Sequence, residues 1–336
     1  MDKLRKSLSK ATHRKKLMLR IVFDILGILA VSSGIFAIQF GTDPFRRGFF
    51  CNDESIQHPV LEDTVSVALA SGVGFFLPFI TIIVVEFILR HGEILCLVPR
   101  KSSSRGQKSW LNSAYSINIA FIFGMAVNQF LTEIGKNSIG RLRPHFLTLC
   151  SPDYSKFNCS DGYITADVCT SNDIDMMKEA RLSFPSGHSS FVAYTMLFLI
   201  LYIEGRVCCK NVVVLKPVFQ LICFCLAFYT CLSRISDYKH HWSDVLSGAV
   251  LGIAVCLCVV FAMTDFSRYL FNRDYSCSED AENLTVETVR AESVEDPDLQ
   301  YDANYRPRAS KSGVPSVEAP QDPPHLSHVI NMSEDL

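Results

Sequence analysis

The sequence contains no zinc-finger or other nucleic-acid-binding motif, and no repeat of a soluble domain is visible in it. Its basic residues are dispersed among apolar segments instead of forming the basic face that a nucleic acid would need. The formal net charge is only −2, and this small value is uninformative because acidic and basic residues lie in different parts of the chain. We therefore expect no nucleic-acid partner.

A cleavable signal peptide is also missing from the first residues. The first apolar run follows a long basic stretch and is long enough to cross a membrane, so we interpret it as a signal anchor. Residues 1–18 contain many Lys and Arg residues and no acidic residue after Asp2. By the positive-inside rule, this arm is predicted to be cytoplasmic.

What the sequence does contain is a set of long apolar runs. Hydrophobic residues make up 49% of the 336 residues, but the long runs all lie before about residue 271. Several uninterrupted apolar stretches of about 20 residues are typical of a polytopic membrane protein and are not found in a soluble domain. We predict six transmembrane helices, at about residues 19–40, 64–89, 111–135, 185–203, 217–232 and 244–266.

The predicted architecture is therefore an all-α polytopic membrane protein in three parts. The basic cytoplasmic arm, residues 1–18, precedes a six-span domain at residues 19–271. Residues 272–336 are acidic and rich in Pro and Ser, with few large apolar residues, which predicts a disordered cytoplasmic tail. Six spans leave both termini in the cytosol, and the basic loop at residues 90–108 agrees with this topology.

The loops opposite the arm are predicted to face an extracytoplasmic, oxidising space, where disulfides are allowed. Of the 13 cysteines, those in these loops are Cys51, Cys150, Cys159 and Cys169. Cys159 and Cys169 lie in one loop and are the first pair to be expected, although four cysteines allow three pairings. The same loop contains the sequon Asn158-Cys-Ser, which predicts N-glycosylation of Asn158.

Three polar stretches lie at edges of apolar runs on this predicted outer face. They are residues 136–144, residues 185–188 (Pro-Ser-Gly-His) and residues 233–244. All three carry cationic or imidazole side chains. Their position at a membrane surface suggests a site for a phosphate group carried on a lipid.

A phosphomonoester is a dianion at neutral pH, and its hydrolysis needs charge neutralisation, an in-line nucleophile and a proton for the leaving oxygen. Lys136, Arg143 and Arg234 could neutralise the charge, and the planar fork of arginine matches phosphate oxygens. Ser186 and Gly187 precede an apolar helix, so their backbone N–H groups would point at the anion.

Two histidines could divide the remaining chemistry. His240 lies four residues before Asp244, so a helix beginning near His240 would place both on one face, where the carboxylate can hold the imidazole. This spacing favours His240 as the nucleophile that forms a phosphohistidine and His188 as the general acid. His241 competes with His240, but its i+4 residue is Val245, so it lacks that partner.

Each stretch also has a simpler interpretation. A Lys/Arg cluster at a membrane edge is usually a headgroup anchor, Pro-Ser-Gly beside a helix is usually a turn with a cap, and a His four residues before an Asp is often a structural pair. The occurrence of all three on one face favours a site. A metal site at His188, His240, His241 and Asp244 is disfavoured by the surrounding lysine and arginines, so we expect neither metal nor cofactor.

The three stretches together resemble the three-part signature of the type-2 phosphatidic acid phosphatase superfamily. The matching positions are Lys136, Arg143-Pro144, Pro185-Ser186-Gly187-His188, Ser233-Arg234, His240 and Asp244. Further stretches, at residues 50–56, 138–146, 158–163 and 236–244, are similar to the animal lipid phosphate phosphatases, also called phospholipid phosphatases. The resemblance covers roughly residues 15–270. Arg141 lies outside the signature, as a neighbouring structural or headgroup contact.

The resemblance implies a six-span enzyme with its site on the outer or lumenal face. It implies Mg²⁺-independent dephosphorylation of phosphatidate, lysophosphatidate, sphingosine 1-phosphate and ceramide 1-phosphate, which attenuates lipid phosphate signalling and supplies diacylglycerol. His240 would be the nucleophile, Asp244 its orienting partner and His188 the acid. The phosphate ligands would be Lys136, Arg143, Ser186, Gly187, Ser233 and Arg234. Homo-oligomers, N-glycosylation at Asn158 and a location in the plasma membrane, or in secretory-pathway membranes, are also expected.

Three other functions remain as alternatives. A non-catalytic relative that binds lipid phosphates or partner proteins would lack catalytic residues, and this chain lacks none of them. Vanadate-dependent haloperoxidases share the signature but are soluble. A lipid phosphotransferase would use the same phosphohistidine and differ only in the acceptor, so the signature alone does not separate it from a hydrolase.

Overall fold

The computed structural model describes residues 2–91, 110–207 and 214–265. In chain order, the helices and strands of these residues are α1 (Asp2–Gly41), β1 (Phe49–Phe50), η1 (Glu54–Ile56), α2 (Val67–His91), α3 (Trp110–Ile139), α4 (Phe146–Cys150), η2 (Cys159–Asp161), β2 (Tyr163–Ile164), α5 (Ile174–Glu179), α6 (Gly187–Arg206), α7 (Leu215–Ser236) and α8 (Trp242–Met263). The predicted tail and most of the basic loop at residues 90–108 lie outside the described residues.

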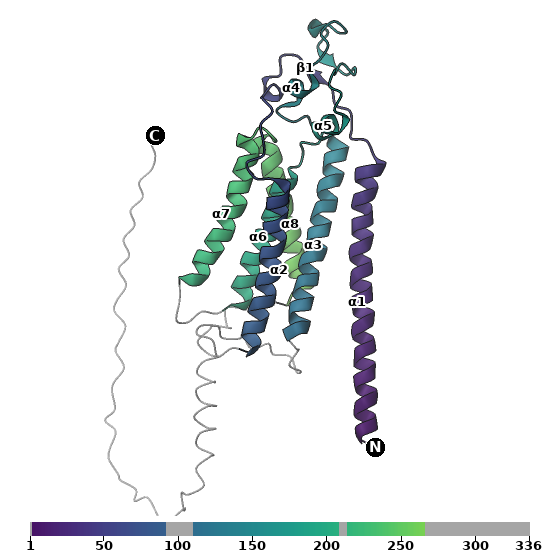
Figure 1. Cartoon of the computed structure of the whole chain (residues 1–336), viewed down its shortest axis with the longest axis vertical. Helices are drawn as coiled ribbons and strands as arrows, with labels where there is room; N and C mark the ends of the chain where they lie inside the picture. Colours follow the sequence, from purple (N-terminus) through teal and green to yellow (C-terminus); the bar gives the residue numbers. More distant parts are fainter. Residues whose placement is uncertain (1, 92–109, 208–213, 266–336) are drawn as a thin grey trace, which may run out of the picture. The chain divides into compact units, whose positions relative to one another are not determined.

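The six predicted spans are confirmed as six long helices, α1, α2, α3, α6, α7 and α8. Within the described residues, these six are long and apolar enough to cross a membrane. They run alternately up and down, so the C-terminal ends of α3 and α7 and the N-terminal ends of α6 and α8 lie at one end of the bundle (Figure 1). Helix α3 extends to Ile139, which places Lys136 inside its last turn.

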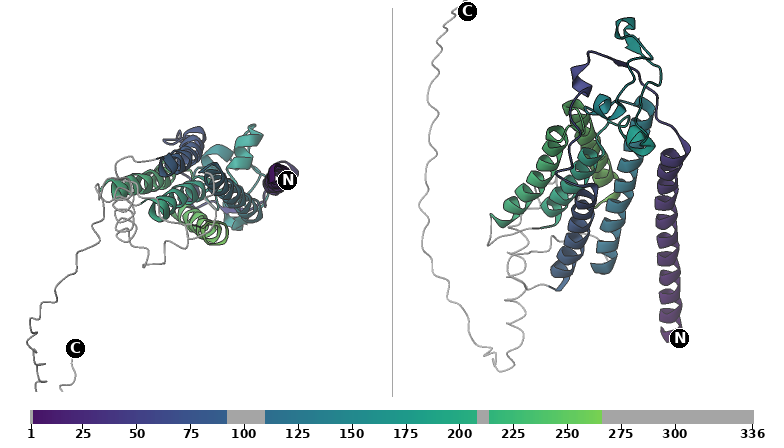
Figure 2. Two further views of the ribbon diagram at one scale, coloured as in Figure 1. Left: turned by 90° about the horizontal axis from the view of Figure 1, so that it is seen from below. Right: turned by 45° about the horizontal axis from the view of Figure 1, so that its top comes forward.

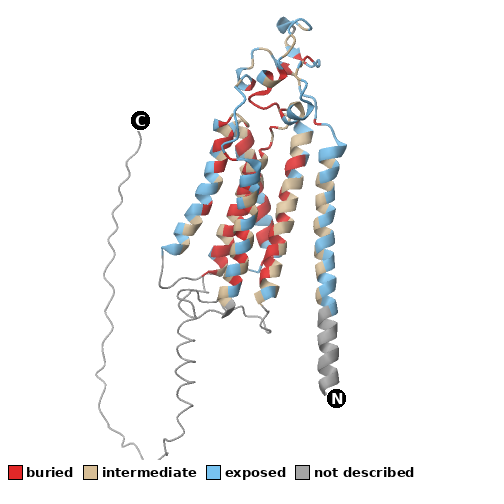
Figure 3. Ribbon diagram, in the orientation of Figure 1, coloured by how far each residue is buried: buried red, intermediate tan, exposed pale blue. Residues whose placement is uncertain are grey.

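Helix α6 lies at the centre of the bundle, where it contacts α2, α3, α7 and α8. Its inward face carries Tyr194 and Phe198, which pack with Phe121 of α3 at ring-centroid distances of 6.0 and 5.3 Å. The Tyr194 hydroxyl donates a hydrogen bond to the Phe121 carbonyl at 2.9 Å, so the one polar group in this aromatic cluster is satisfied. Buried residues accordingly concentrate on the inner faces of α3, α6 and α8 (Figure 3).

Helix α1 stands at the edge of the bundle. It packs on α3, as the views in Figure 2 show. From residue 15 onward, most of its apolar side chains are exposed, as in a lipid-facing helix. Its one acidic side chain at membrane depth, Asp24, accepts a hydrogen bond from Tyr115 at 2.9 Å and lies 3.7 Å from Arg20. Asp24 therefore has the structural pairing that such a group needs in an apolar surrounding.

Two loop regions, residues 42–66 and 140–186, form a cap over the end of the bundle. Strands β1 and β2 pair antiparallel within it, and a small core of Phe49, Ile56, Leu142 and Phe146 packs beneath them. This cap lies above the ends of α3, α6 and α7 (Figure 1). It is therefore placed to supply side chains to any site at those helix ends.

The cap is cross-linked by two disulfides, Cys51–Cys159 and Cys150–Cys169. The expected pair Cys159–Cys169 is therefore wrong. Backbone pairing explains the difference. The β1–β2 ladder brings the segment after Phe50 beside the segment before Tyr163, and an isolated bridge joins Pro152 to Cys169.

Candidate active site

The three predicted stretches meet where the helix ends converge beneath the cap. The Ser186 backbone N–H donates to the Asp244 carbonyl at 3.0 Å, which ties the start of α6 to the start of α8. On α7, the Arg234 carbonyl accepts from the N–H groups of both Lys239 and His240 at 3.1 Å. The link between α7 and α8 therefore folds back tightly over the end of α7 and places His240 next to α6.

The start of α6 offers an anion site of the expected kind. Ser186 caps the helix, with its hydroxyl accepting from the Ser189 N–H at 3.5 Å, and Gly187 is the first helical residue. A Cβ on Gly187 would lie 3.3 Å from Lys136 Nζ, so a larger residue there would make the lysine shift by a few tenths of an ångström. The helix N-terminus and the lysine ammonium thus place positive charge at the same point.

Arg143 enters the site from the cap. Gly140, at φ +56°, ends α3 in the left-handed region that glycine adopts without strain, and the chain then turns to deliver Arg143. The Arg143 backbone N–H donates to the Ala180 carbonyl at 2.8 Å, and its guanidinium Nη2 lies 3.0 Å from Glu179 Oε1. Burial lowers the pKa of Arg143, but a guanidinium stays protonated, so the site contains a buried cation.

Arg234 is the most deeply buried cation of the site, with only 1% of its surface exposed. Nη1 contacts Asp63 at 2.7 Å and Nη2 contacts Asp237 at 2.8 Å. Asp237 in turn accepts from the backbone N–H and the hydroxyl of Thr64 at 2.9 and 2.6 Å. Burial would raise the pKa of Asp63, but the hydrogen bond from Arg234 and the charge of Lys239 outweigh it and lower that pKa.

His240 is buried, and its Nδ1 lies 2.7 Å from the Ser183 carbonyl oxygen. Because a carbonyl only accepts, Nδ1 must carry the proton, and Nε2 is left with a free lone pair. Burial, followed by the charges of Arg143 and Lys136, holds the pKa of His240 well below its ordinary value. The ring is therefore neutral at physiological pH, the form in which an imidazole can act as a nucleophile.

Asp244 does not contact His240 in the way that the spacing predicted. Helix α8 begins at Trp242, so His240 precedes the helix and the i,i+4 geometry does not apply. Asp244 instead accepts from the Ser183 hydroxyl at 2.6 Å, and no hydrogen bond joins the two side chains within the part of the chain that the structure describes. Ser183 connects them, because its carbonyl holds His240 and its hydroxyl holds Asp244.

His241 and Arg141 complete the surroundings of Asp244. The prediction that His241 lacks a partner is wrong, because its Nδ1 and its backbone N–H both lie 3.1 Å from Asp244 Oδ2. Arg141 contacts the other carboxylate oxygen and also donates to the Ser243 hydroxyl at 2.8 Å. The i,i+3 spacing at a helix start, rather than i,i+4 within a helix, determines which histidine Asp244 binds.

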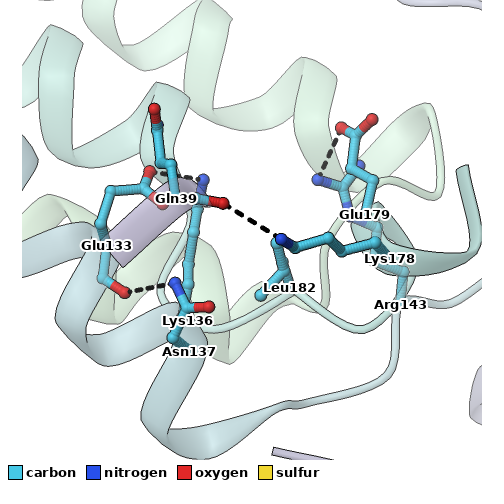
Figure 4. Close-up of a pocket in the computed structure, with 8 residues that line it drawn as sticks. All are labelled: Gln39, Glu133, Lys136, Asn137, Arg143, Lys178, Glu179 and Leu182. Carbon is cyan, nitrogen blue, oxygen red and sulfur yellow. Dashed lines mark hydrogen bonds and ion pairs between the residues drawn. The ribbon is translucent and has the colours of Figure 1, made fainter. Parts of the chain in front are cut away.

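A cavity of about 100 Å³ gathers the reactive groups. His188, His240, Arg143 and Arg234 line it together with Asp63, which precedes α2, and Lys239, which lies between α7 and α8. Of the other predicted ligands, Ser186 and Ser233 are buried and do not line this cavity. Lys136 lines a neighbouring cavity that also includes Arg143 (Figure 4). His188 Nε2 is buried, with no hydrogen-bond partner among the described residues.

Chemically, this cavity suits an anion with two or more acceptor oxygens. The guanidinium groups of two arginines line it together with His240, a neutral histidine with a free Nε2. His188 also lines it and could transfer a proton. Across the described parts of the chain, no group of three or more His, Cys, Asp or Glu side chains gathers in a way that could hold a metal ion.

Several site residues were not found from the sequence. Asp63, Glu179 and Ser183 have no spacing that marks them, because the folded cap brings them to the site. Lys239 lies in the short link between α7 and α8, whose tight turn the sequence did not reveal. Asp237 was missed although it lies three residues after Arg234 at the end of a predicted helix. That i,i+3 spacing is a signal for an ion pair.

Comparison with known proteins agrees with the signature. The family model of the PAP2 superfamily matches residues 118–268. The chain is 40% identical over 289 residues to phospholipid phosphatase 1 of Rattus norvegicus, covering 85% of this chain and 97% of the rat protein. It is 39% identical over 249 residues to phospholipid phosphatase 2 of Homo sapiens, covering 74% of this chain and 84% of the human protein.

Proposed function

Because this chain belongs to the phospholipid phosphatases of the PAP2 superfamily, a phosphatidate-phosphatase type of membrane hydrolase, we propose that it cleaves lipid phosphomonoesters through a phosphohistidine at His240. The substrates proposed are phosphatidate, lysophosphatidate, sphingosine 1-phosphate and ceramide 1-phosphate. The observation that carries the mechanism is the hydrogen bond from His240 Nδ1 to the Ser183 carbonyl, which leaves Nε2 free on a histidine that lines the cationic cavity.

In the first proposed step, the phosphate dianion binds between Arg143 and Arg234, with Lys136 and the start of α6 adding positive charge. His240 Nε2 then attacks phosphorus as the ester P–O bond breaks in line with it. His188, which takes up a proton as the phosphate dianion binds and neutralises the surrounding cations, gives that proton to the leaving alkoxide. The products of this step are a free lipid alcohol and a phosphohistidine.

In the second step, neutral His188 takes a proton from a water molecule as the water oxygen attacks phosphorus. The P–N bond breaks and its electron pair returns to His240 Nε2. Inorganic phosphate leaves, and His188 is again protonated. The Ser183 carbonyl stabilises the positive charge that His240 carries while phosphorylated, and Asp244 and Arg141 hold Ser183 and α8 in place.

We also propose the organisation predicted from the sequence: an arm at residues 1–18, a six-span domain at residues 19–271 and a tail at residues 272–336. In this proposal the site faces outward at the plasma membrane or into a secretory lumen. Asn158 is glycosylated, and the protein forms homo-oligomers. An outward site would attenuate lipid phosphate signals and supply diacylglycerol.

The experiment that tests the activity is phosphate release from phosphatidate by the purified protein in EDTA. The wild type should turn over, and His240→Ala should lose activity by at least about 10³-fold, because the nucleophile is gone. His58→Ala is the matched control, since His58 belongs to the cap but stacks on Tyr238 instead of lining the cavity. Full activity of His240→Ala, or restoration by Mg²⁺ after loss in EDTA, would contradict the mechanism.

A further inference from the structure

The ion pair between Arg143 and Glu179 stands between two cavities. Both residues line the catalytic cavity, and both also line a second cavity of about 210 Å³ beside it. Lys136 and Lys178 contribute to the wall of the second cavity, as Figure 4 shows. The carboxylate of Glu179 therefore occupies an arginine fork at the position that an incoming phosphate would need.

The two partners of this pair are unequally exposed. The Arg143 side chain is 10% exposed, whereas the Glu179 side chain is 66% exposed. A buried guanidinium needs a counter-ion, because leaving it alone in a desolvated site is unfavourable. An exposed carboxylate, by contrast, remains well solvated when it moves away, so the pair is easily exchanged for another anion.

Arg234, in the same cavity, has a counter-ion that is buried and held in place. Its partner Asp237 is only 8% exposed and is fixed by two hydrogen bonds from Thr64. Among the described residues, Glu179 is the one carboxylate within ion-pair distance of Arg143, and Arg143 Nε has no hydrogen-bond partner there. Arg143 therefore has unused donor capacity and an exchangeable partner.

We propose that Glu179 is a competing carboxylate that displaces inorganic phosphate from Arg143 after each turnover. The inference rests on the proposed hydrolase function. In the empty site Glu179 neutralises Arg143, and a lipid phosphate dianion replaces it because the dianion carries more charge and more acceptor oxygens. After hydrolysis the carboxylate returns, and the second cavity gives space for the exchange. Glu179 is thus a specificity-determining residue that keeps the affinity for product low.

The test measures equilibrium binding of inorganic phosphate to the full-length protein, together with its inhibition constant against phosphatidate. Glu179→Gln removes the charge but keeps an acceptor for Arg143. It should bind phosphate about threefold to fivefold more tightly and lower the inhibition constant by the same factor. Glu179→Asp keeps the charge on a shorter side chain, so its affinity for phosphate should lie between those of the wild type and Glu179→Gln.

The matched control is Asp167→Asn, which removes the same charge from the same cap. Asp167 is exposed and pairs with Arg46 away from both cavities, so its phosphate affinity should stay within about twofold of the wild type. An equal gain in both variants would assign the effect to net charge and overturn the proposal. Monodispersity and melting temperature confirm that each variant is folded.

Two further results would overturn the competing role of Glu179. Unchanged phosphate affinity in Glu179→Gln would show that the carboxylate does not compete. Weaker phosphate binding with a raised KM would show that Glu179 instead positions Arg143. Failure of the proposed function gives a different result, namely no phosphate release from lipid by the wild type, and phosphate binding can still be measured in that case.

Discussion

The proton on His240 decides whether this site can form a covalent intermediate. Because Nδ1 donates to the Ser183 carbonyl, the opposite nitrogen keeps the lone pair that the proposed nucleophile needs. A backbone carbonyl therefore holds the ring in the way that the sequence had suggested for Asp244. Asp244 contacts His240 only indirectly, because it accepts a hydrogen bond from the hydroxyl of the same serine. Ser183 therefore connects Asp244 to His240, the proposed nucleophile.

Ser183→Ala should lower kcat by about tenfold to a hundredfold with little change in KM, because it loosens the positioning of His240 and Asp244 without removing a phosphate ligand. Asp244→Asn should cost at least as much, since it also affects Arg141 and His241. Steady-state kinetics on both variants check this. A large rise in KM with normal kcat would contradict a positioning role.

The depressed pKa of His240 gives a second prediction. Exposed histidines protonate near pH 6.5, whereas His240 should stay neutral, with its proton on Nδ1, well below that pH. ¹⁵N spectra of histidine-labelled protein, assigned with His240→Gln, would show this. Below about pH 6.5 the unfolded chain binds a proton that folded His240 does not bind, so stability decreases progressively as the pH falls from about 6.5 toward the lowered pKa of folded His240. A normal titration would contradict the burial of the ring.

The helices were predictable and the cap was not. A membrane helix forms all its backbone hydrogen bonds within its own segment, so the length of an apolar run is enough to predict it. The spans of α2 and α8 therefore follow from local composition. The cap depends on pairing between distant segments, such as β1 with β2, and this pairing leaves no periodic signal in short irregular strands. The signature residues were therefore found, whereas Asp63, Glu179 and Ser183 were missed.

The disulfide pairing in the cap can be checked directly. Peptide mapping without reduction should recover Cys51 linked to Cys159 and Cys150 linked to Cys169. Replacing Cys150 and Cys169 together by Ser should lower the stability of the cap by about 3 kcal/mol, as expected for a loop closed over 19 residues. Recovery of a Cys159–Cys169 peptide would contradict the arrangement of β1 and β2.

For the molecule as a whole, the central question is which side of the membrane the cap faces. Asn158 is exposed in the cap, and its Oδ1 accepts from the Ser160 N–H at 3.1 Å. In an outward or lumenal cap, this asparagine should carry a glycan. Treatment with an endoglycosidase should shift the wild type on a gel and leave Asn158→Gln unchanged. An unshifted wild type, with the cap reached only by cytosolic probes, would reverse the proposed topology.

The most direct test of the account is to trap the phosphorylated enzyme. Brief incubation with phosphatidate labelled with ³²P in its phosphate, followed by an alkaline quench, should give an acid-labile phosphoprotein whose label maps to the peptide containing His240. A more acidic leaving alcohol departs without help from a general acid, so His188→Ala can still form the phosphohistidine from such a substrate. The water that hydrolyses the phosphohistidine is no longer activated in this variant, so the label should accumulate. Label on another residue, or turnover with no label in either protein, would contradict the covalent role of His240.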